Sequence, residues 1–253
     1  MIIYFNGEYI KASTANISPT DRGLMLGDGV FETLFYNGTE IEGLRPHFDR
    51  LVKGATLFQI PFPLTISEFR SILLTIIEQN NLESTSTALR FTLTRGPSER
   101  GLVPPQSVSP TFLVTAQAYQ RSSQLLQVGF SQYCFQQSSI LSGVKHLGYQ
   151  LPLLGRLEAE QRGLDDVLFF NEAGYLVSAT AANVFILNRG VLITPPLSEG
   201  CLPGIMRGKI IQEMQQTSTP VRIDHITRQD VEEAAKIFLT NSLIGSVLAT
   251  YKP

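Results

Sequence analysis

The chain has 253 residues, a formal net charge of −2 at pH 7 and 43% hydrophobic residues. This composition is typical of a soluble globular protein and differs from that of disordered or fibrous chains. The length predicts one large domain or two smaller ones. Because the chain is nearly neutral and has no Lys/Arg-rich block, nucleic acid is excluded as its expected main partner.

Signals for membranes, secretion and metals are also missing from the sequence. No apolar run approaches the roughly 18 residues that span a membrane, and the start MIIYFNGEYIKAS does not resemble a secretory signal. Cys134 and Cys201 form no disulfide framework, and three scattered histidines cannot supply a zinc cluster. We therefore expect a cytoplasmic protein that acts on small molecules and has no metal, membrane or nucleic-acid partner.

The N-terminal part reads as an α+β domain. IIYFNG and EYIKA predict a hairpin around Asn6-Gly7, and VFETLFYNG and TEIEGL predict a second hairpin around Asn37-Gly38. HFDRLVKGATLF has helical spacing, and SEFRSILLTIIEQNNL predicts an amphipathic helix over residues 67–82 with Ser67 as its N-cap. TALRFTLTRG and TFLVTAQAY then predict two strands.

A polar stretch without a clear period, QRSSQ (120–124), predicts a linker between domains of residues 1–119 and 125–253. After it, LQVGFSQYCF predicts a strand, LGRLEAEQRG a helix, and DDVLFFN, YLVSA, NVFILN and VLITP four short strands. PGIMRGKIIQEMQQ and DVEEAAKIF predict two more helices, and IFLTNSLIGSVLA ends the chain with strand-like residues. We expect two α+β domains, with the ligand pocket where they meet.

Lys145 differs from the other five lysines, because it lies alone among small and apolar residues in ILSGVKHLGYQ (140–150). Such neighbours would desolvate its ammonium group and lower its pKa. A desolvated lysine is the kind that forms Schiff bases with carbonyl compounds. The alternative is a lysine whose ammonium group reaches solvent from an apolar loop.

Two further patterns suit anions. In LPGIMR (202–207), a glycine lies at the start of a predicted helix, whose N–H groups and dipole can hold a phosphate-sized anion. Arg50 could add a charge-assisted bond, and the pair Arg95 and Arg100 in TRGPSERGL could clamp a carboxylate. Taken singly, these patterns are better explained by an ordinary helix start and by exposed arginines.

Together, these pieces resemble the fold-type IV pyridoxal-phosphate enzymes, the class IV aminotransferase family. This family includes branched-chain and D-amino-acid aminotransferases and 4-amino-4-deoxychorismate lyase. The resemblance covers nearly the whole chain, and an ordered series of motifs carries it: DRGLMLGDGVFETL (21–34), HFDRL (47–51), TRG (94–96), LGYQLPLLGRLEAEQRGLDDVLFFN (147–171), TAANVF (180–185), GIMR (204–207) and FLTNSL (238–243). It implies a two-domain α+β fold with pyridoxal 5′-phosphate in the cleft between the domains, and Lys145 on the larger C-terminal domain.

The resemblance also implies roles for single residues. Lys145 would bind the cofactor as a Schiff base and then move protons on one face of the substrate. Arg100 would meet a substrate carboxylate, and Phe31 and Thr33 would line the pocket wall. The chain would act as a homodimer. The residues that match the phosphate-binding set are Arg50, Ile205, Met206, Asn241 and Ser242.

Within the family, the motifs look most like the lyase, which converts 4-amino-4-deoxychorismate to 4-aminobenzoate and pyruvate on the way to folate. The Tyr, Arg and His that hold the carboxylate in D-amino-acid aminotransferases are here Phe31, Arg100 and Leu102, so two of three donors are missing. KHL, which begins with Lys145, as well as GIMR, TNSL and the short chain, resemble the lyase. The alternatives are a D-amino-acid or branched-chain aminotransferase, and a non-catalytic cofactor-binding relic.

Ser178 departs from the family pattern, which has at this position a glutamate that pairs with the pyridine nitrogen of the cofactor. A carboxylate keeps that nitrogen protonated and makes the ring a strong electron sink, which a neutral serine cannot do. A weaker sink disfavours transamination and matters less for an elimination that yields an aromatic product. Ser178 therefore either supports a lyase or marks a site that is degraded or serves other chemistry.

Overall fold

The chain folds into two units, each built around its own β-sheet. The computed structural model describes residues 1–137, 139–217 and 220–253. Unit 1 contains residues 1–120 and 144–148, and unit 2 contains residues 121–143 and 149–253. Residues 144–148 with Lys145, which the sequence assigns to the C-terminal domain, group with unit 1 and hydrogen-bond to one of its strands.

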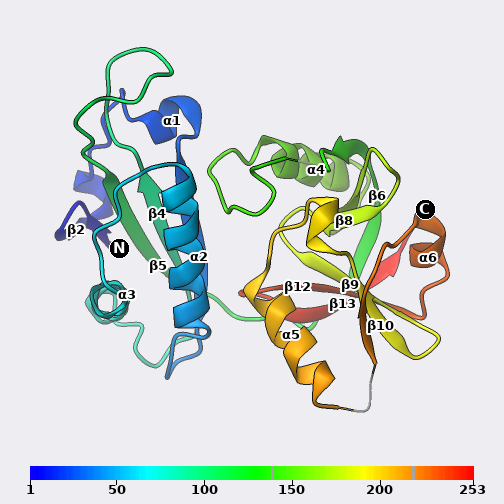
Figure 1. Cartoon of the computed structure of the whole chain (residues 1–253). Coiled ribbons are helices and arrows are strands. Elements are labelled where there is room, and N and C mark those ends of the chain that lie inside the picture. The colour runs from blue at the N-terminus through cyan, green and yellow to red at the C-terminus, as the bar shows by residue number, and fades with distance from the viewer. Residues whose placement is uncertain (138, 218–219) are drawn as a thin grey trace. The chain divides into compact units, whose positions relative to one another are not determined.

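Unit 1 contains a five-stranded antiparallel sheet with the order β2-β1-β5-β4-β3 (Figure 1). Its first hairpin turns at Asn6 and Gly7, whose φ values of 49° and 102° are those that an Asn-Gly turn requires. The elements are β1 (Ile2–Phe5), β2 (Glu8–Lys11), α1 (Arg22–Leu26), β3 (Gly29–Tyr36), α2 (Leu44–Leu57), α3 (Ile66–Gln79), β4 (Thr87–Thr94) and β5 (Thr111–Ala118).

The predicted second hairpin is reduced to a turn. Asn37 and Gly38 follow β3 as expected, but only one bridge, between Tyr36 and Ile41, forms after the turn. Helix α2 then begins at Leu44, directly after Gly43 in the left-handed conformation. The helix start therefore leaves no length for a return strand.

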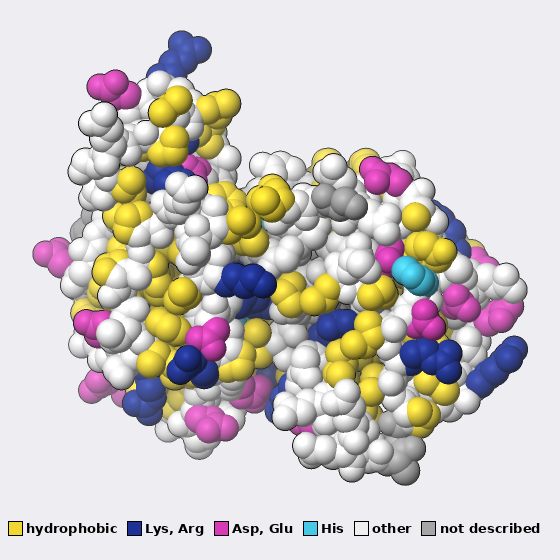
Figure 2. Space-filling model, in the orientation of Figure 1, with side chains coloured by type: hydrophobic (Ala, Val, Ile, Leu, Met, Phe, Trp, Pro, Cys, Tyr) yellow, Lys and Arg dark blue, Asp and Glu magenta, His cyan; other side chains and the backbone are white. Residues whose placement is uncertain are grey.

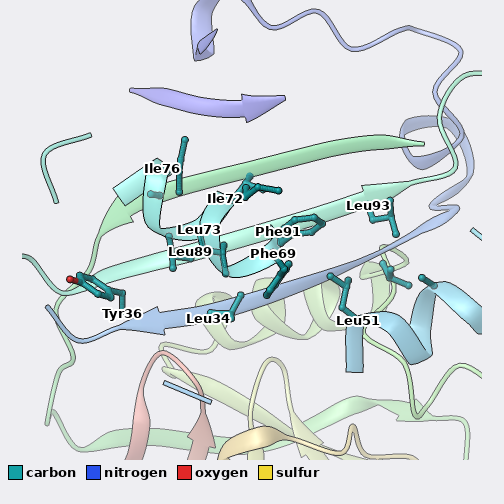
Figure 3. Packing of buried hydrophobic residues seen from close by; sticks show 14 of the residues in the cluster. Leu34, Tyr36, Leu51, Phe69, Ile72, Leu73, Ile76, Leu89, Phe91 and Leu93 are labelled. Atoms are coloured by element: carbon teal, nitrogen blue, oxygen red, sulfur yellow. The ribbon is translucent and has the colours of Figure 1, made fainter. Parts of the chain in front are cut away.

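Apolar side chains from α2, α3 and one face of the sheet form the core of unit 1 (Figure 3). Figure 3 shows Phe69 of α3 beside Phe91 of β4, and their ring centroids are 5.0 Å apart. Leu34 of β3 and Leu51 of α2 belong to the same buried cluster. Because side chains alternate along a strand, the neighbours of Leu34 in β3 point to the opposite face of the sheet.

Unit 2 contains an eight-stranded mixed sheet with the order β11-β10-β9-β12-β13-β6-β7-β8 (Figure 1). Among the described residues, no helix is long and apolar enough to cross a membrane. The elements are β6 (Leu126–Phe135), α4 (Gln150–Gln161), β7 (Asp166–Asn171), β8 (Leu176–Ala179), β9 (Asn183–Asn188), β10 (Val191–Thr194), α5 (Ile205–Gln215), β11 (Val221–Ile223), α6 (Arg228–Glu232), β12 (Lys236–Asn241) and β13 (Gly245–Tyr251).

The helix predicted for DVEEAAKIF (230–238) is wrong after Glu232. Thr227 caps α6, which ends at Glu232. Lys236 begins β12, which pairs with β9 on one side and β13 on the other. The β-branched and aromatic residues after Lys236 suit a central strand, and pairing with two neighbours overrides the helical pattern before them.

The N-cap of α3 is Thr65 rather than the predicted Ser67. The hydroxyl of Thr65 accepts from the Glu68 N–H at 3.3 Å, and the Glu68 carboxylate accepts from the Thr65 N–H at 2.7 Å. These reciprocal bonds form a capping box, whereas Ser67 is an exposed residue inside the helix.

Replacing Thr65 by alanine should lower the free energy of unfolding by about 1 kcal/mol, because the helix start loses its cap. Ser67→Ala is the matched control and should change it by less than about 0.5 kcal/mol. Urea unfolding followed by circular dichroism measures both variants. Equal losses in the two would show that the capping box contributes nothing.

Candidate functional site

Lys145 is held in place through its own backbone. Its carbonyl accepts from the Phe31 N–H at 2.9 Å, and the N–H of Leu147 donates to the Gly29 carbonyl at 3.0 Å. Gly29 allows this approach, because a Cβ there would lie 2.7 Å from the Leu147 side chain and 2.5 Å from the Leu93 carbonyl. The lysine segment therefore lies along β3, and the half-buried Lys145 extends over the Phe31 ring, with Nζ 4.4 Å from its centroid.

Arg90 lies on the same ring and is a residue that the sequence reasoning missed. Its Cζ is 3.8 Å from the Phe31 centroid. Arg90 is opposite Thr33 in the β3–β4 register, so Phe31, Thr33 and Arg90 share the sheet face away from the helices. The sequence does contain a signal for Arg90. It is the one charged residue in the strand TALRFTLT, whose other residues are apolar or threonine. The structure thus brings together Lys145, Phe31 and Thr33 and adds a second cation.

Arg50 is fixed by a carboxylate that the sequence reasoning also missed. Glu32 of β3 is fully buried and accepts from Arg50 Nε at 2.6 Å and Nη2 at 2.8 Å. His47, one helical turn before Arg50 in α2, bonds the same carboxylate through Nδ1 at 2.7 Å. The bidentate bond orients the guanidinium plane of Arg50. Arg50 is therefore a rigidly placed cation rather than a solvated one.

The charge of Glu32 is retained despite its burial. Desolvation alone would raise the pKa of its carboxyl group, but hydrogen bonds from Arg50 and His47, and their charges, lower this pKa to about 2. Because the carboxylate is ionised, Nδ1 of His47 is the donor in their bond. Loss of one basic partner would leave this buried charge less compensated and would destabilise the fold.

In unit 2, the start of α5 has the features of an anion cradle. Gly204 is its N-cap, and no side chain caps the helix, so the first N–H groups, among them those of Ile205 and Met206, point out of the helix. A Cβ on Gly204 would lie 1.9 Å from the Asn183 side-chain oxygen. An uncapped helix start with this close approach suits a phosphate group.

The turn that carries Ser242 is shaped from two sides. The Asn241 side chain donates to the Ala181 carbonyl at 3.1 Å and accepts from the N–H groups of Leu243 and Ile244. Arg121, in the predicted linker, donates to the carbonyls of Ser242 and Leu243, both at 2.9 Å. The Asn241 amide is thus committed to the turn, and Arg121 is a further residue that the sequence reasoning missed.

Ser178 lies half-buried on β8, opposite Phe169 of β7. Of the three buried carboxylates among the described residues of unit 2, Glu158 accepts from Ser131 and Glu199 accepts from Asn171, while Asp166 accepts from the Thr180 N–H, two residues after Ser178. Each of these buried carboxylates thus already accepts a hydrogen bond from a group other than Ser178.

The arginines of the TRG loop have different environments, so the predicted pair is not a clamp. Arg95 is 6% exposed, and its guanidinium bonds the Asp28 carboxylate and the carbonyls of Phe58 and Gln59. Arg100 is exposed. Only Arg100 keeps the accessibility that a carboxylate-binding residue needs.

Other candidate groups do not form a site in the described residues. No group of three or more His, Cys, Asp and Glu side chains could hold a metal ion there. His146 accepts the Gly148 N–H through Nδ1 at 3.0 Å, and burial lowers its pKa, so this neighbour of Lys145 is neutral at pH 7. On the face shown in Figure 2, basic side chains are mixed with acidic and apolar ones.

Comparisons with known proteins agree on one family. The family model "Amino-transferase class IV" matches residues 29–249. A protein of Methanocaldococcus jannaschii, provisionally named branched-chain-amino-acid aminotransferase, is 30% identical over 96% of this chain and 84% of its own length. A Legionella pneumophila structure, provisionally named 4-amino-4-deoxychorismate lyase, has 28% identity and a TM-score of 0.87, and covers 95% of this chain and 88% of that one.

The branched-chain amino acid aminotransferase of Escherichia coli has the same fold, with a TM-score of 0.93 and 24% identity over 99% of this chain and 86% of that one. These likenesses confirm the predicted fold class, a mixed α/β fold of the class IV type.

Lowering the pH should lower the free energy of unfolding, because Glu32 becomes protonated. Because its pKa is lower in the folded protein (about 2) than its ordinary value of 4.5, its ionisation stabilises the fold fully above pH 4.5. This contribution, about 3 kcal/mol, is lost as the pH falls from 4.5 to 2. In Glu32→Gln, urea unfolding should lose that part of the pH dependence. Asp49→Asn, which removes an exposed ion pair with Arg45, should keep it; parallel profiles for Glu32→Gln and wild type would contradict the assignment.

Gly204→Ala should weaken binding of pyridoxal 5′-phosphate about tenfold, the effect of losing one strong hydrogen bond to the anion. Its methyl group would displace the Asn183 side chain at the helix start. Gly208→Ala, one turn later in α5, has open space for its Cβ and should bind as wild type does. Absorbance titration of the apoprotein measures both affinities, and equal values would rule out the cradle.

Proposed function

Because this chain belongs to the class IV aminotransferase family, we propose that it is an aminodeoxychorismate lyase. The reaction converts 4-amino-4-deoxychorismate to 4-aminobenzoate and pyruvate. Pyridoxal 5′-phosphate is the cofactor of the family, and a small molecule is the substrate. The homodimer and the cytoplasmic location that the sequence implies stay predictions.

The residues present fit this cofactor. The uncapped start of α5, with Gly204 against Asn183, is suited to a phosphate group. By resemblance to the family, Arg50, oriented by Glu32, and the turn with Asn241 and Ser242 would also bind the phosphate. Lys145 would bind the cofactor aldehyde, and Ser178 would face the pyridine nitrogen. This assignment of Ile205 and Met206 N–H groups and of Arg50 to phosphate rests on the family resemblance as well.

The contact of two cations with Phe31 is the observation that carries the proposal. Lys145 Nζ and Arg90 Cζ lie 4.4 Å and 3.8 Å from the centroid of one ring. The lyase substrate is a dicarboxylate, in which one carboxylate is on the ring and the other on the enolpyruvyl group. A guanidinium beside the reacting lysine can hold one carboxylate, and the exposed Arg100 can hold the other. A branched-chain substrate would offer Arg90 and Arg100 only one carboxylate.

The mechanism assigns proton transfer to Lys145. When bound, the cofactor withdraws electrons from the carbon that bears the substrate nitrogen. As a neutral amine, Lys145 removes the proton from that ring carbon as a general base. The electrons then form the aromatic ring, the bond from the ring to the enolpyruvyl oxygen breaks, and the Lys145 ammonium returns a proton to the leaving enolpyruvate, which becomes pyruvate. Phe31 and Thr33 would line this pocket.

Ser178 supports elimination over transamination. Transamination needs a strongly electron-withdrawing cofactor, which a carboxylate at the pyridine nitrogen favours. Ser178 offers a neutral hydroxyl, and the buried carboxylates of unit 2 already accept hydrogen bonds from other groups. Elimination gains its driving force from the aromatic product and therefore depends less on that carboxylate.

A branched-chain aminotransferase is the second candidate, because the Methanocaldococcus jannaschii relative of that name is 30% identical. It predicts that an amino acid such as leucine converts the bound cofactor to its pyridoxamine form. The lyase predicts no such conversion and instead release of pyruvate. A non-catalytic relic predicts neither reaction.

The holoenzyme should release 4-aminobenzoate and pyruvate in equal amounts from aminodeoxychorismate, and Lys145→Ala should lower the rate at least about a hundredfold, as loss of a general base does. Lys53→Ala, at an exposed position of α2, is the control and should retain full activity. Product chromatography measures the rates. If leucine converts the bound cofactor to its pyridoxamine form and no pyruvate is released, the protein is an aminotransferase. If neither reaction occurs, it is a non-catalytic relic.

A further inference from the structure

One buried side chain, Arg22, ties down the loop between β4 and β5. This loop, residues 95–110, is the green loop above β4 and β5 in Figure 1. Arg22 is 5% exposed, and it donates from Nη1 to the Gly101 carbonyl at 2.9 Å and from Nη2 to the Leu102 carbonyl at 3.0 Å. These carbonyls belong to the two residues that directly follow Arg100.

Asp28 fixes the guanidinium of Arg22. Its Oδ2 accepts from Nε of Arg22 and from Nε of Arg95, both at 2.7 Å. Burial alone would raise the pKa of Asp28, but the hydrogen bonds and charges of Arg95 and Arg22 outweigh burial and lower it. The carboxylate therefore stays ionised, and Arg22 has one orientation, with its outer nitrogens directed to the loop.

The loop is closed at its base but exposed near Arg100. Gly96 has a φ of 84°, and a Cβ there would lie 1.9 Å from the Ser109 carbonyl, so the two ends of the loop are in backbone contact. Arg100 itself and both residues after it are exposed, with Leu102 80% exposed. Arg22 contacts this exposed part of the loop through its bonds to the carbonyls of Gly101 and Leu102 and through a long 3.4 Å contact with Ser98.

We propose that Arg22, held by Asp28, is a positioning residue that orders residues 98–102 and so places Arg100 for a substrate carboxylate. This inference rests on the proposed function, since it takes Arg100 to bind that carboxylate. Charge-assisted bonds to two successive carbonyls restrict the backbone on the C-terminal side of Arg100. If the loop is already ordered, binding of the substrate to the Arg100 guanidinium does not cost the conformational entropy that ordering a flexible loop would.

Arg22→Lys tests the proposal, because it keeps the positive charge beside Asp28 but loses the planar fork that reaches both carbonyls. Arg45→Lys is the matched control, since Arg45 lies in the same unit, pairs with Asp49 and is exposed. Both variants keep the cleavage specificity of trypsin at the changed position. Urea unfolding of both proteins checks that each is folded under the assay conditions.

The first readout is limited trypsin digestion of the native holoenzyme, in which mass spectrometry follows cleavage after Arg100. Arg22→Lys should increase this rate about tenfold, as expected when one or two charge-assisted bonds are lost, with no change at other sites. Wild type and Arg45→Lys should be cut equally slowly. An unchanged rate after Arg100, or an equal increase at every site in unit 1, would overturn the proposal.

The second readout is kinetic and tests whether Arg22 acts through Arg100. Arg22→Lys should raise KM for aminodeoxychorismate about tenfold with kcat nearly unchanged, and Arg100→Gln should raise KM at least as much. Adding Arg22→Lys to Arg100→Gln should then change KM less than about twofold, because coupled residues are not additive. Independent, multiplying effects would overturn the positioning role.

The two readouts separate failure of this inference from failure of the proposed function. If the holoenzyme releases no pyruvate, the lyase assignment fails and the substrate part of the inference falls with it. The trypsin comparison does not depend on turnover and still decides whether Arg22 orders the loop. If pyruvate is released but Arg100→Gln leaves KM unchanged, the lyase assignment holds. Arg100 is then not a substrate-binding residue that Arg22 could position.

Discussion

The backbone pairing of residues 144–148 with β3 is the constraint on which the candidate site depends. It places Lys145 by main-chain bonds to Phe31 and Gly29, so the position of the lysine does not depend on the partners of its side chain. Alternation along the same strand then sends Phe31 and Thr33 to the lysine side and Glu32 to the helix side, where Arg50 lies. One strand thus positions both the predicted Schiff-base lysine, Lys145, and the predicted phosphate-binding cation, Arg50.

Unit 1 contains two clusters in which a buried carboxylate orients two basic side chains. Glu32 bonds Arg50 and His47, and Asp28 bonds Arg22 and Arg95. In both cases two basic side chains share one carboxylate, so desolvation of the acid is offset and its charge is kept. Because these bonds restrict the orientation of each guanidinium, its remaining nitrogens have a defined direction. The acids therefore set the geometry even though they would touch neither cofactor nor substrate.

Local patterns could be predicted from the sequence, and long-range pairings could not. The Asn6-Gly7 turn and the strands β4 and β5 follow from residues adjacent in the chain. The residues after Lys236 are strand-like in sequence, but the preceding helical pattern overlaps them, and the pairing with β9 and β13 that decides between the two is long-range. The motifs identified Lys145 and Arg50, but the buried Glu32 has no neighbour in sequence that indicates its partners. Arg95 reads as exposed because its acceptors at Asp28 and Phe58 are distant in sequence.

The return of residues 144–148 to unit 1 has a consequence for how the protein can be made. The chain passes between the units at three points, after residues 120, 143 and 148. A fragment that ends at Gln120 would leave β3 without the main-chain partners at Gly29 and Phe31. During synthesis, the first unit therefore stays incomplete until the start of the second has left the ribosome. Assembly of the two units is interleaved rather than sequential.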